Sequence, residues 1–213
     1  MLRYDRDTPE FARVANLSDA VFAIAMTLLV LTLDVPASSG DRLAAALLEQ
    51  LPQLVAFVLA FALVANLWWQ HHKLMAQFQC VEPGMVGVML ALLGAVALVP
   101  FPTSLVGNAP TDPIAVLAFI ATFLLLSLLF LLLVWRARRV AALVETVTEP
   151  LYYWMIGQWV SGSLVLLMAV AVTLWRPVAG LTILALTIVL GPVAARRGAT
   201  SSQRLSRRFL RED

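Results

Sequence analysis

Long apolar stretches without charge constrain this chain more than any other feature of its sequence. A helix needs about 20 mostly apolar residues to cross the hydrocarbon core of a bilayer. Five stretches of that kind contain no Asp, Glu, Lys or Arg: 51–70, 84–107, 114–135, 151–175 and 177–195. A sixth, 14–33, contains a single charge, Asp19. The sequence therefore predicts an all-α, polytopic membrane protein with six transmembrane helices.

The composition agrees with a bilayer as solvent. Hydrophobic residues make up 61% of the chain and charged residues 13%, whereas soluble domains average roughly 45–50% and about 25%. The only cysteine, Cys80, excludes an intramolecular disulfide and is expected to be a buried apolar residue. There is no phosphate loop and no zinc motif. The one basic run lacks the interleaved aromatics typical of nucleic-acid binding. We expect membrane lipid as surroundings, and no cofactor, metal or nucleic acid.

The breaks between the apolar stretches carry turn residues such as Pro36, Pro83 and Pro177, and they are too short to hold a soluble domain. No internal repeat is evident. We expect a single domain over 1–213, ending in a basic tail over 196–213.

Lys and Arg are distributed unevenly between the two sides of the predicted helices. The leader, the loop after the second span, the loop after the fourth and the tail together hold 13 of the 15 basic residues, against Arg42 and Arg176 on the other side. Basic loops stay in the cytoplasm. The prediction is a cell-membrane protein with both termini cytoplasmic.

Asp19 is the exceptional residue of the first span. A lone acid in a span costs roughly 2.5–3.5 kcal/mol on insertion scales and marks a functional site by default. Ser18 precedes it, and the second span returns to the same side of the membrane. We therefore expect an inter-helix polar network of Arg13, Ser18, Asp19, Trp68, Trp69, His71 and His72. Such a network is either a structural clamp or a proton relay; the clamp is favoured because later spans offer no further acid.

The opposite side of the first span is an apolar stripe. On a helical wheel, Ala20, Thr27, Leu28 and Leu31 lie within about 60° of Ile24, and Ser18 and Asp19 lie about 120–140° away. From the residues alone, such a stripe would face lipid or pack into a core.

The segment Arg13-x-x-x-Leu17-Ser18-Asp19 resembles the Arg-x-x-x-Phe-Ser-Asp signature of the endolysosomal potassium channels called transmembrane protein 175, and of their prokaryotic relatives. The Trp-x-x-His-His pattern and the stretch 98–103 are also similar to that family. Leu17 stands where the family has Phe. The resemblance covers the first three spans.

The resemblance implies six-span subunits that assemble as homotetramers around a pore lined by their first spans, without the carbonyl filter loop of ordinary potassium channels. It places the constriction, or gate, at Ile24, with further apolar rings at Leu28 and Leu31. It assigns potassium selectivity to Thr27. The implied function is a potassium-preferring cation channel, not an enzyme, with K⁺ as the permeant ion.

Two rival functions stay open at this point. One is a proton-coupled secondary transporter using Asp19 and the His71/His72 pair, although no repeats or broken helices indicate it. The other is a membrane enzyme or haem protein using the two histidines, whose side chains point about 100° apart on a helix. Asp34, near the outer mouth, either concentrates cations or is an ordinary interfacial acid.

Overall fold

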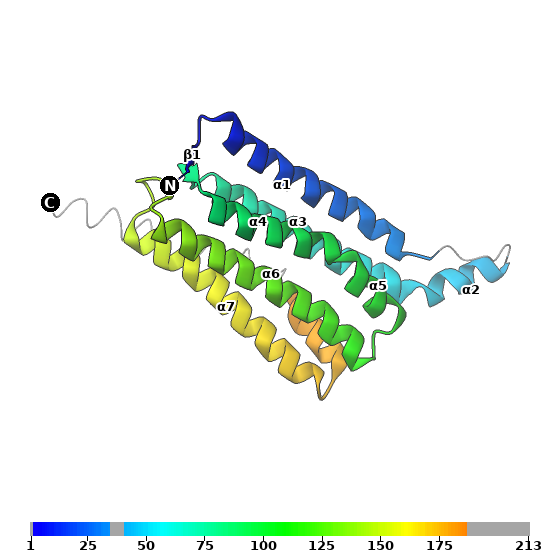
Figure 1. Ribbon diagram of the computed structural model, residues 1–213. Helices are drawn as coiled ribbons and strands as arrows, with labels where there is room; N and C mark the ends of the chain where they lie inside the picture. The colour runs from blue at the N-terminus through cyan, green and yellow to red at the C-terminus, as the bar shows by residue number, and fades with distance from the viewer. Residues whose placement is uncertain (1, 35–40, 187–213) are drawn as a thin grey trace.

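The computed structural model describes residues 2–34 and 41–186 as a bundle of long helices (Figure 1). The helices are α1 (Pro9–Leu28), α2 (Asp41–Glu49), α3 (Leu51–Met75), α4 (Pro83–Leu98), α5 (Pro100–Asn108), α6 (Pro113–Arg139) and α7 (Glu149–Thr173). The 3₁₀ turn η1 (Leu29–Thr32) continues α1. Five helical segments are long and apolar enough to cross a membrane, with α1–η1 and α4–α5 each counting as one. The helical membrane fold is thus confirmed.

The sixth predicted span is described only at its start. An apolar helix covers Pro177–Leu186. The rest of that span, 187–195, and the basic tail, 196–213, lie outside the described residues. The count of six spans therefore stays a prediction.

Helix starts follow local chemistry that hydropathy does not show. Thr8 caps α1 by accepting a hydrogen bond from the amide of Phe11, and Pro9 occupies the first turn. The helix thus begins before the predicted Val14. Asp112 caps α6 in the same way, accepting from the amides of Ile114 and Ala115.

The third span, predicted as continuous over 84–107, is broken. Helix α4 ends at Leu98 and α5 begins at Pro100. Proline has no N–H to donate and clashes with the preceding turn, so it interrupts a helix. At the break, the carbonyl of Val99 accepts from both the amide of Thr103, at 3.2 Å, and the hydroxyl of Thr103, at 2.8 Å.

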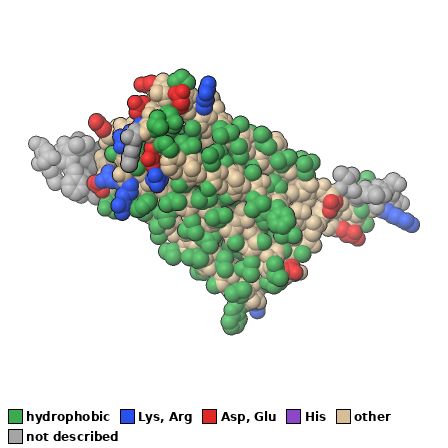
Figure 2. Space-filling model, viewed as in Figure 1, with side chains coloured by type: hydrophobic (Ala, Val, Ile, Leu, Met, Phe, Trp, Pro, Cys, Tyr) green, Lys and Arg blue, Asp and Glu red, His purple; other side chains and the backbone are tan. Residues whose placement is uncertain are grey.

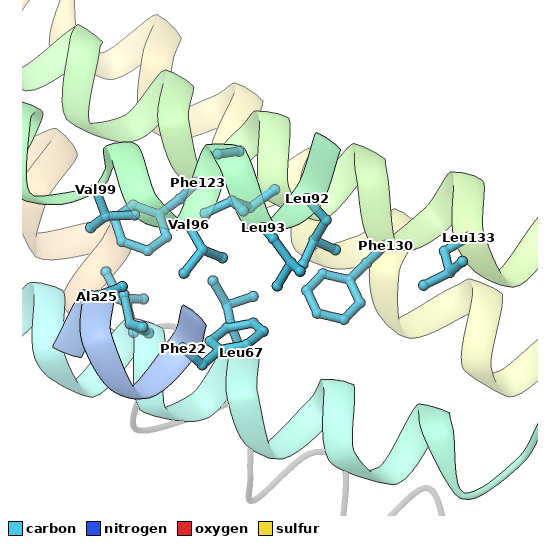
Figure 3. Packing of buried hydrophobic residues seen from close by; sticks show 14 of the residues in the cluster. Phe22, Ala25, Leu67, Leu92, Leu93, Val96, Val99, Phe123, Phe130 and Leu133 are labelled. Atoms are coloured by element: carbon cyan, nitrogen blue, oxygen red, sulfur yellow. The ribbon is translucent and has the colours of Figure 1, made fainter. Parts of the chain in front are cut away.

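The core lies between α1, α3, α4 and α6. Phe22 of α1 and Leu67 of α3 approach Val96 of α4, and Phe130 of α6 continues the cluster (Figure 3). Without a hydrophobic driving force inside a bilayer, such contacts hold the helices together by dispersion and shape.

The basic end of the bundle carries a small cap that the sequence did not suggest. Strands β1 (Tyr4–Asp5) and β2 (Cys80–Val81) pair antiparallel, so the leader is tied to the α3–α4 turn. Glu82 accepts from Arg136 Nε at 2.7 Å across the same end. Each strand has only two residues, so the sequence shows no alternation of apolar and polar residues from which a strand could be predicted.

Figure 2 shows Lys, Arg, Asp and Glu gathered at this end beside a broad apolar surface.

Candidate functional site

Helix α1 lies at one edge of the bundle and packs on one side only (Figure 1). Its neighbours are α3 and α4. The buried positions are Phe11, Ser18, Phe22, Ala25 and, in η1, Leu29. Both aromatic residues of α1 are therefore turned inward, leaving its other side free of aromatic side chains.

The uncovered side of α1 is the stripe identified on the helical wheel. Ile24 is 57% exposed, Leu28 40% and Leu31 75%. Thr27 and Ala20 are exposed on the same side. The Thr27 hydroxyl donates its proton to the carbonyl of Ile24 at 2.8 Å. Its oxygen lone pairs remain available to a cation or water on the uncovered side.

The carboxylate of Asp19 is joined to the second span through an indole. Trp68 Nε1 donates to Asp19 Oδ1 at 2.9 Å. Ser18 is fully buried, but its hydroxyl donates to the carbonyl of Val14 at 3.0 Å, within its own helix. The structure thus pairs Asp19 directly with α3, whereas Ser18 satisfies its donor locally.

The two histidines occupy different surroundings. His71 is 1% exposed and lies between the rings of Phe22 and Phe130, at centroid distances of 5.5 and 6.1 Å. Neither of its ring nitrogens has a hydrogen-bond partner in the described part of the chain. His72 is exposed and stacks on Trp69 at 5.8 Å.

Arg13 is exposed, and no hydrogen bond or ion pair engages its side chain within residues 2–34 and 41–186. Of the expected network, the structure brings together Asp19 and Trp68 by a hydrogen bond, and Trp68, Trp69 and His72 by ring contacts. No hydrogen-bonded chain links Asp19 to either histidine across the described residues. The geometry resembles a clamp between α1 and α3 more than a relay.

A second polar cluster, at the opposite end of α1, escaped the sequence reasoning apart from Asp34. Gln53 of α3 donates through Nε2 to Asp34 Oδ2 at 2.8 Å and to Asn108 Oδ1 at 2.7 Å. The amide of Asp34 donates to Gln53 Oε1 at 3.0 Å. The available signal was weak: an amide residue just inside the second span and another at the end of the third.

A cavity of about 700 Å³ lies between α3, α6, α7 and the helix Pro177–Leu186, and none of its lining residues belongs to α1. Within the described residues, no group of three or more His, Cys, Asp or Glu side chains gathers in a way that could hold a metal ion. The uncovered side of α1 and its two polar anchors therefore form the candidate site.

The family model described as "Endosomal/lysosomal potassium channel TMEM175" matches residues 13–100, which include most of α1 and all of α3 and α4. A potassium channel of Streptomyces collinus is 37% identical over 100 residues, covering 46% of this chain and 48% of the relative. A potassium channel of Chamaesiphon minutus is 32% identical over 127 residues, covering 57% and 63%. The human endosomal/lysosomal proton channel TMEM175 is 31% identical over 136 residues, covering 58% and 27%.

The chain thus spans about half to two thirds of the length of the bacterial relatives in these alignments. Its fold extends the likeness further. The crystal structure of a lysosomal potassium-selective channel TMEM175 homologue from Chamaesiphon minutus superposes with a TM-score of 0.74, covering 92% of this chain and 99% of that one at 24% identity. That likeness includes the helices beyond residue 100, where the family model ends.

Proposed function

This chain belongs to the TMEM175 family, and from that premise we propose that it is a potassium-preferring cation channel. One observation carries the proposal. The helix that holds the family signature leaves Ile24, Thr27, Leu28 and Leu31 uncovered, although a hydrogen bond from Trp68 to Asp19 joins the same helix to α3. An uncovered stripe with a hydroxyl and no aromatic side chain suits a pore better than lipid.

The proposed assembly is a homotetramer in which four copies of this stripe surround a central axis. Ala20 and Ala23 are exposed beside Ile24, and small residues let helices approach closely in membranes. Four Ile24 side chains would form a narrow apolar neck that gates by dewetting. β-Branching makes each of them stiff. Leu28 and Leu31 would add apolar rings toward the outer end.

Thr27 is the proposed source of potassium preference. Its hydroxyl proton is engaged by the helix backbone, so its oxygen would present lone pairs to the pore axis. Such a ring replaces only part of an ion's hydration shell. Because potassium sheds water more readily than sodium, the expected preference is modest.

In this proposal the Asp19–Trp68 pair holds α1 against α3 and does not conduct. A proton-coupled transporter would need Asp19 and the histidines to exchange protons along a path. The described residues supply no hydrogen-bonded path of this kind. The channel proposal is therefore the better supported of the two.

The decisive experiment is reconstitution of the full chain into liposomes with an outward K⁺ gradient. We expect a K⁺ flux that persists without a pH gradient, and a smaller Na⁺ flux under matched conditions. Flux that requires a pH gradient would support the transporter instead. Cross-linking of the same preparation should give a tetramer, and a monomer that conducts would contradict the pore assignment.

The proposed orientation has both termini in the cytoplasm, with the β1–β2 cap on that side. Arg3, Arg6 and Arg136 make their contacts at that end of the bundle, and Lys73 lies in the last turn of α3 there, supporting this orientation. Cysteines introduced at Ser39 and Ser202 test it in spheroplasts. Ser39→Cys should react with a membrane-impermeant maleimide from outside, and labelling of Ser202→Cys from outside would overturn the orientation.

A further inference from the structure

The chain just beyond the outer end of α1 is hydrogen-bonded by one side chain of the second span, Gln53. We infer that Gln53 is a positioning residue for the pore helix: its amide ties Asp34, two residues beyond η1, to α3 and to the end of α5. The functional part of this inference rests on the proposed channel. The structural part does not, and it can be tested separately.

Both the oxygen and the nitrogen of the Gln53 side-chain amide form hydrogen bonds in this cluster. Oε1 accepts from the backbone amide of Asp34 at 3.0 Å, and Nε2 donates to Asp34 Oδ2 at 2.8 Å and to Asn108 Oδ1 at 2.7 Å. Reversing the amide would place its oxygen against a carboxylate and its NH₂ against an N–H. The orientation is therefore determined by its partners.

The contact with Asp34 engages both backbone and side chain. Asp34 lies two residues beyond the end of η1. The amide of Leu33 still donates to the carbonyl of Val30 at 3.2 Å, and the Asp34 amide, the next along the chain, donates to Gln53 instead. A hydrogen bond to an ionised carboxylate is roughly twice as strong as one between neutral groups. Gln53 thus fixes both the path of the chain and the direction of the carboxylate.

The contact with Asn108 extends this anchor to the third span. Asn108 is the last residue of α5, and its Nδ2 also reaches Ser104 Oγ at 3.4 Å. Gly107 permits the close approach, because a Cβ there would lie 3.1 Å from the Cα of Gln53. Since α5 is set off from α4 by the break at Pro100, a tie at Gln53 defines where this short helix sits against α3.

The Asp19–Trp68 pair anchors α1 near its middle, and Gln53 anchors the chain beyond its outer end. The apolar rings at Ile24, Leu28 and Leu31 lie between the two anchors. Loss of the outer one should loosen the last turns of the pore helix while leaving the inner one intact.

A charge-conserving exchange tests the pairing. Gln53→Glu turns the donor into a carboxylate and sets it against Asp34, which removes both Nε2 hydrogen bonds. Asp34→Asn/Gln53→Glu restores a donor at position 34, lets Asn108 turn its amide to donate, and returns the local charge to that of the parent. Asp34→Asn alone is the control for charge, because its oxygen still accepts from Gln53.

The first readout is amide hydrogen exchange in detergent for a peptide covering 29–34. We expect Gln53→Glu to exchange about tenfold faster there, as for one lost hydrogen bond of about 1.4 kcal/mol. The double variant should return to the parent rate. A peptide from α4 should be unchanged in every variant, which shows that the bundle is folded. Parent-like exchange in Gln53→Glu, or fast exchange in both variants, would overturn the inference.

The second readout is K⁺ flux per incorporated protein in liposomes. Gln53→Glu should differ from the parent by about threefold or more, a size typical of coupling through packed helices, and the double variant should not. Unchanged flux in an active Gln53→Glu protein would refute the positioning role. If the parent itself carries no K⁺, the channel proposal fails, and the exchange measurement still decides whether Gln53 anchors α1.

Discussion

Helices α1 and α7 both expose apolar side chains, yet their exposed faces differ in kind. Exposed side chains on or just beyond α7 include Tyr153, Leu164, Leu167 and Trp175, with an aromatic residue near each end. The exposed face of α1 carries Asn16, Ala20, Ala23 and Thr27 among its leucines and isoleucine, and both of its aromatics are buried. The exposure of apolar side chains alone therefore does not distinguish a helix that faces lipid from a helix that packs against another subunit.

The arrangement of polar and aromatic groups makes the distinction. Aromatic side chains at both ends suit a lipid face, because their rings sit at the level of the headgroups. Small and hydroxyl-bearing residues suit packing against helices or contact with ions. We interpret α7 as facing lipid and α1 as facing its own copies around a pore. The following predictions test this contrast, from the largest expected effect to the smallest.

The same polar substitution should act differently on the two faces. Ile24→Asn should wet the constriction and raise basal K⁺ and Na⁺ flux by about tenfold, because hydration then persists through the neck. Leu164→Asn on α7 should leave flux unchanged and cost about 1–3 kcal/mol of stability, as an amide facing hydrocarbon. Liposome flux and thermal unfolding in detergent measure the two effects.

Two further variants test the same assignment of the constriction to Ile24. Ile24→Phe should reduce flux by narrowing the neck. Leu29→Ala, at a fully buried position one residue beyond Leu28, should lower stability by about 2–5 kcal/mol with little change in permeation. If Ile24→Asn conducts like the parent while Leu164→Asn or Leu29→Ala does not, the pore is lined by another face.

Asp19→Asn should weaken the inner anchor of α1. The variant keeps an acceptor for Trp68 Nε1 but loses the charge that strengthens the bond, at a cost of about 1 kcal/mol. We expect lower recovery of the tetramer and an unchanged K⁺/Na⁺ ratio in the protein that assembles. Size-exclusion chromatography and bi-ionic reversal potentials measure the two quantities. Normal assembly combined with lost selectivity would mean that Asp19 lines the conduction path.

Thr27→Val keeps the shape of the side chain and removes its oxygen. If that oxygen replaces part of the hydration shell, the K⁺/Na⁺ permeability ratio should fall by about two- to fivefold while conduction persists, the range of one modest hydrogen bond. Thr182, on the helix Pro177–Leu186, offers a matched control, because its hydroxyl also donates to a backbone carbonyl of its own helix. A bi-ionic reversal potential identical to that of the parent would leave selectivity to the width of the neck alone.

Cysteine accessibility offers the mildest test of the contrast. Leu31→Cys should react with a cationic methanethiosulfonate, whereas Leu167→Cys, facing lipid, should not. Burial raises the pKa of the native Cys80 thiol, so little thiolate forms at neutral pH and its background labelling should be slow, rising only as the pH increases. Equal modification rates at positions 31 and 167 would remove the distinction between the faces.

Much of this protein could be predicted from hydropathy and charge. Each long apolar helix of the described residues overlaps one predicted stretch, and Cys80 is buried as expected. Ile24, Thr27, Leu28 and Leu31 are exposed together on one side of the first span. These properties depend on chain composition and on a 3.6-residue period, both of which are local. The break at Pro100 could also have been predicted, because proline interrupts a helix. The residues on both sides of it are apolar, so hydropathy alone indicated one continuous span.

The tertiary structure alone decided which polar groups meet. Arg13, Ser18, Asp19 and the two histidines lie on two neighbouring helices, yet only Asp19 reaches Trp68 by a hydrogen bond, whereas His71 is buried against phenylalanine rings. Likewise, nothing in the sequence indicated that Gln53 contacts Asp34 and Asn108. Gln53 is 19 residues from Asp34 and 55 residues from Asn108 along the chain. Hydropathy determines which helices can cross the bilayer, whereas capping residues such as Thr8 and Asp112 determine where they begin. The pairing of their polar side chains depends on the rotation and spacing of neighbouring helices, and these are set by the packing of the whole bundle.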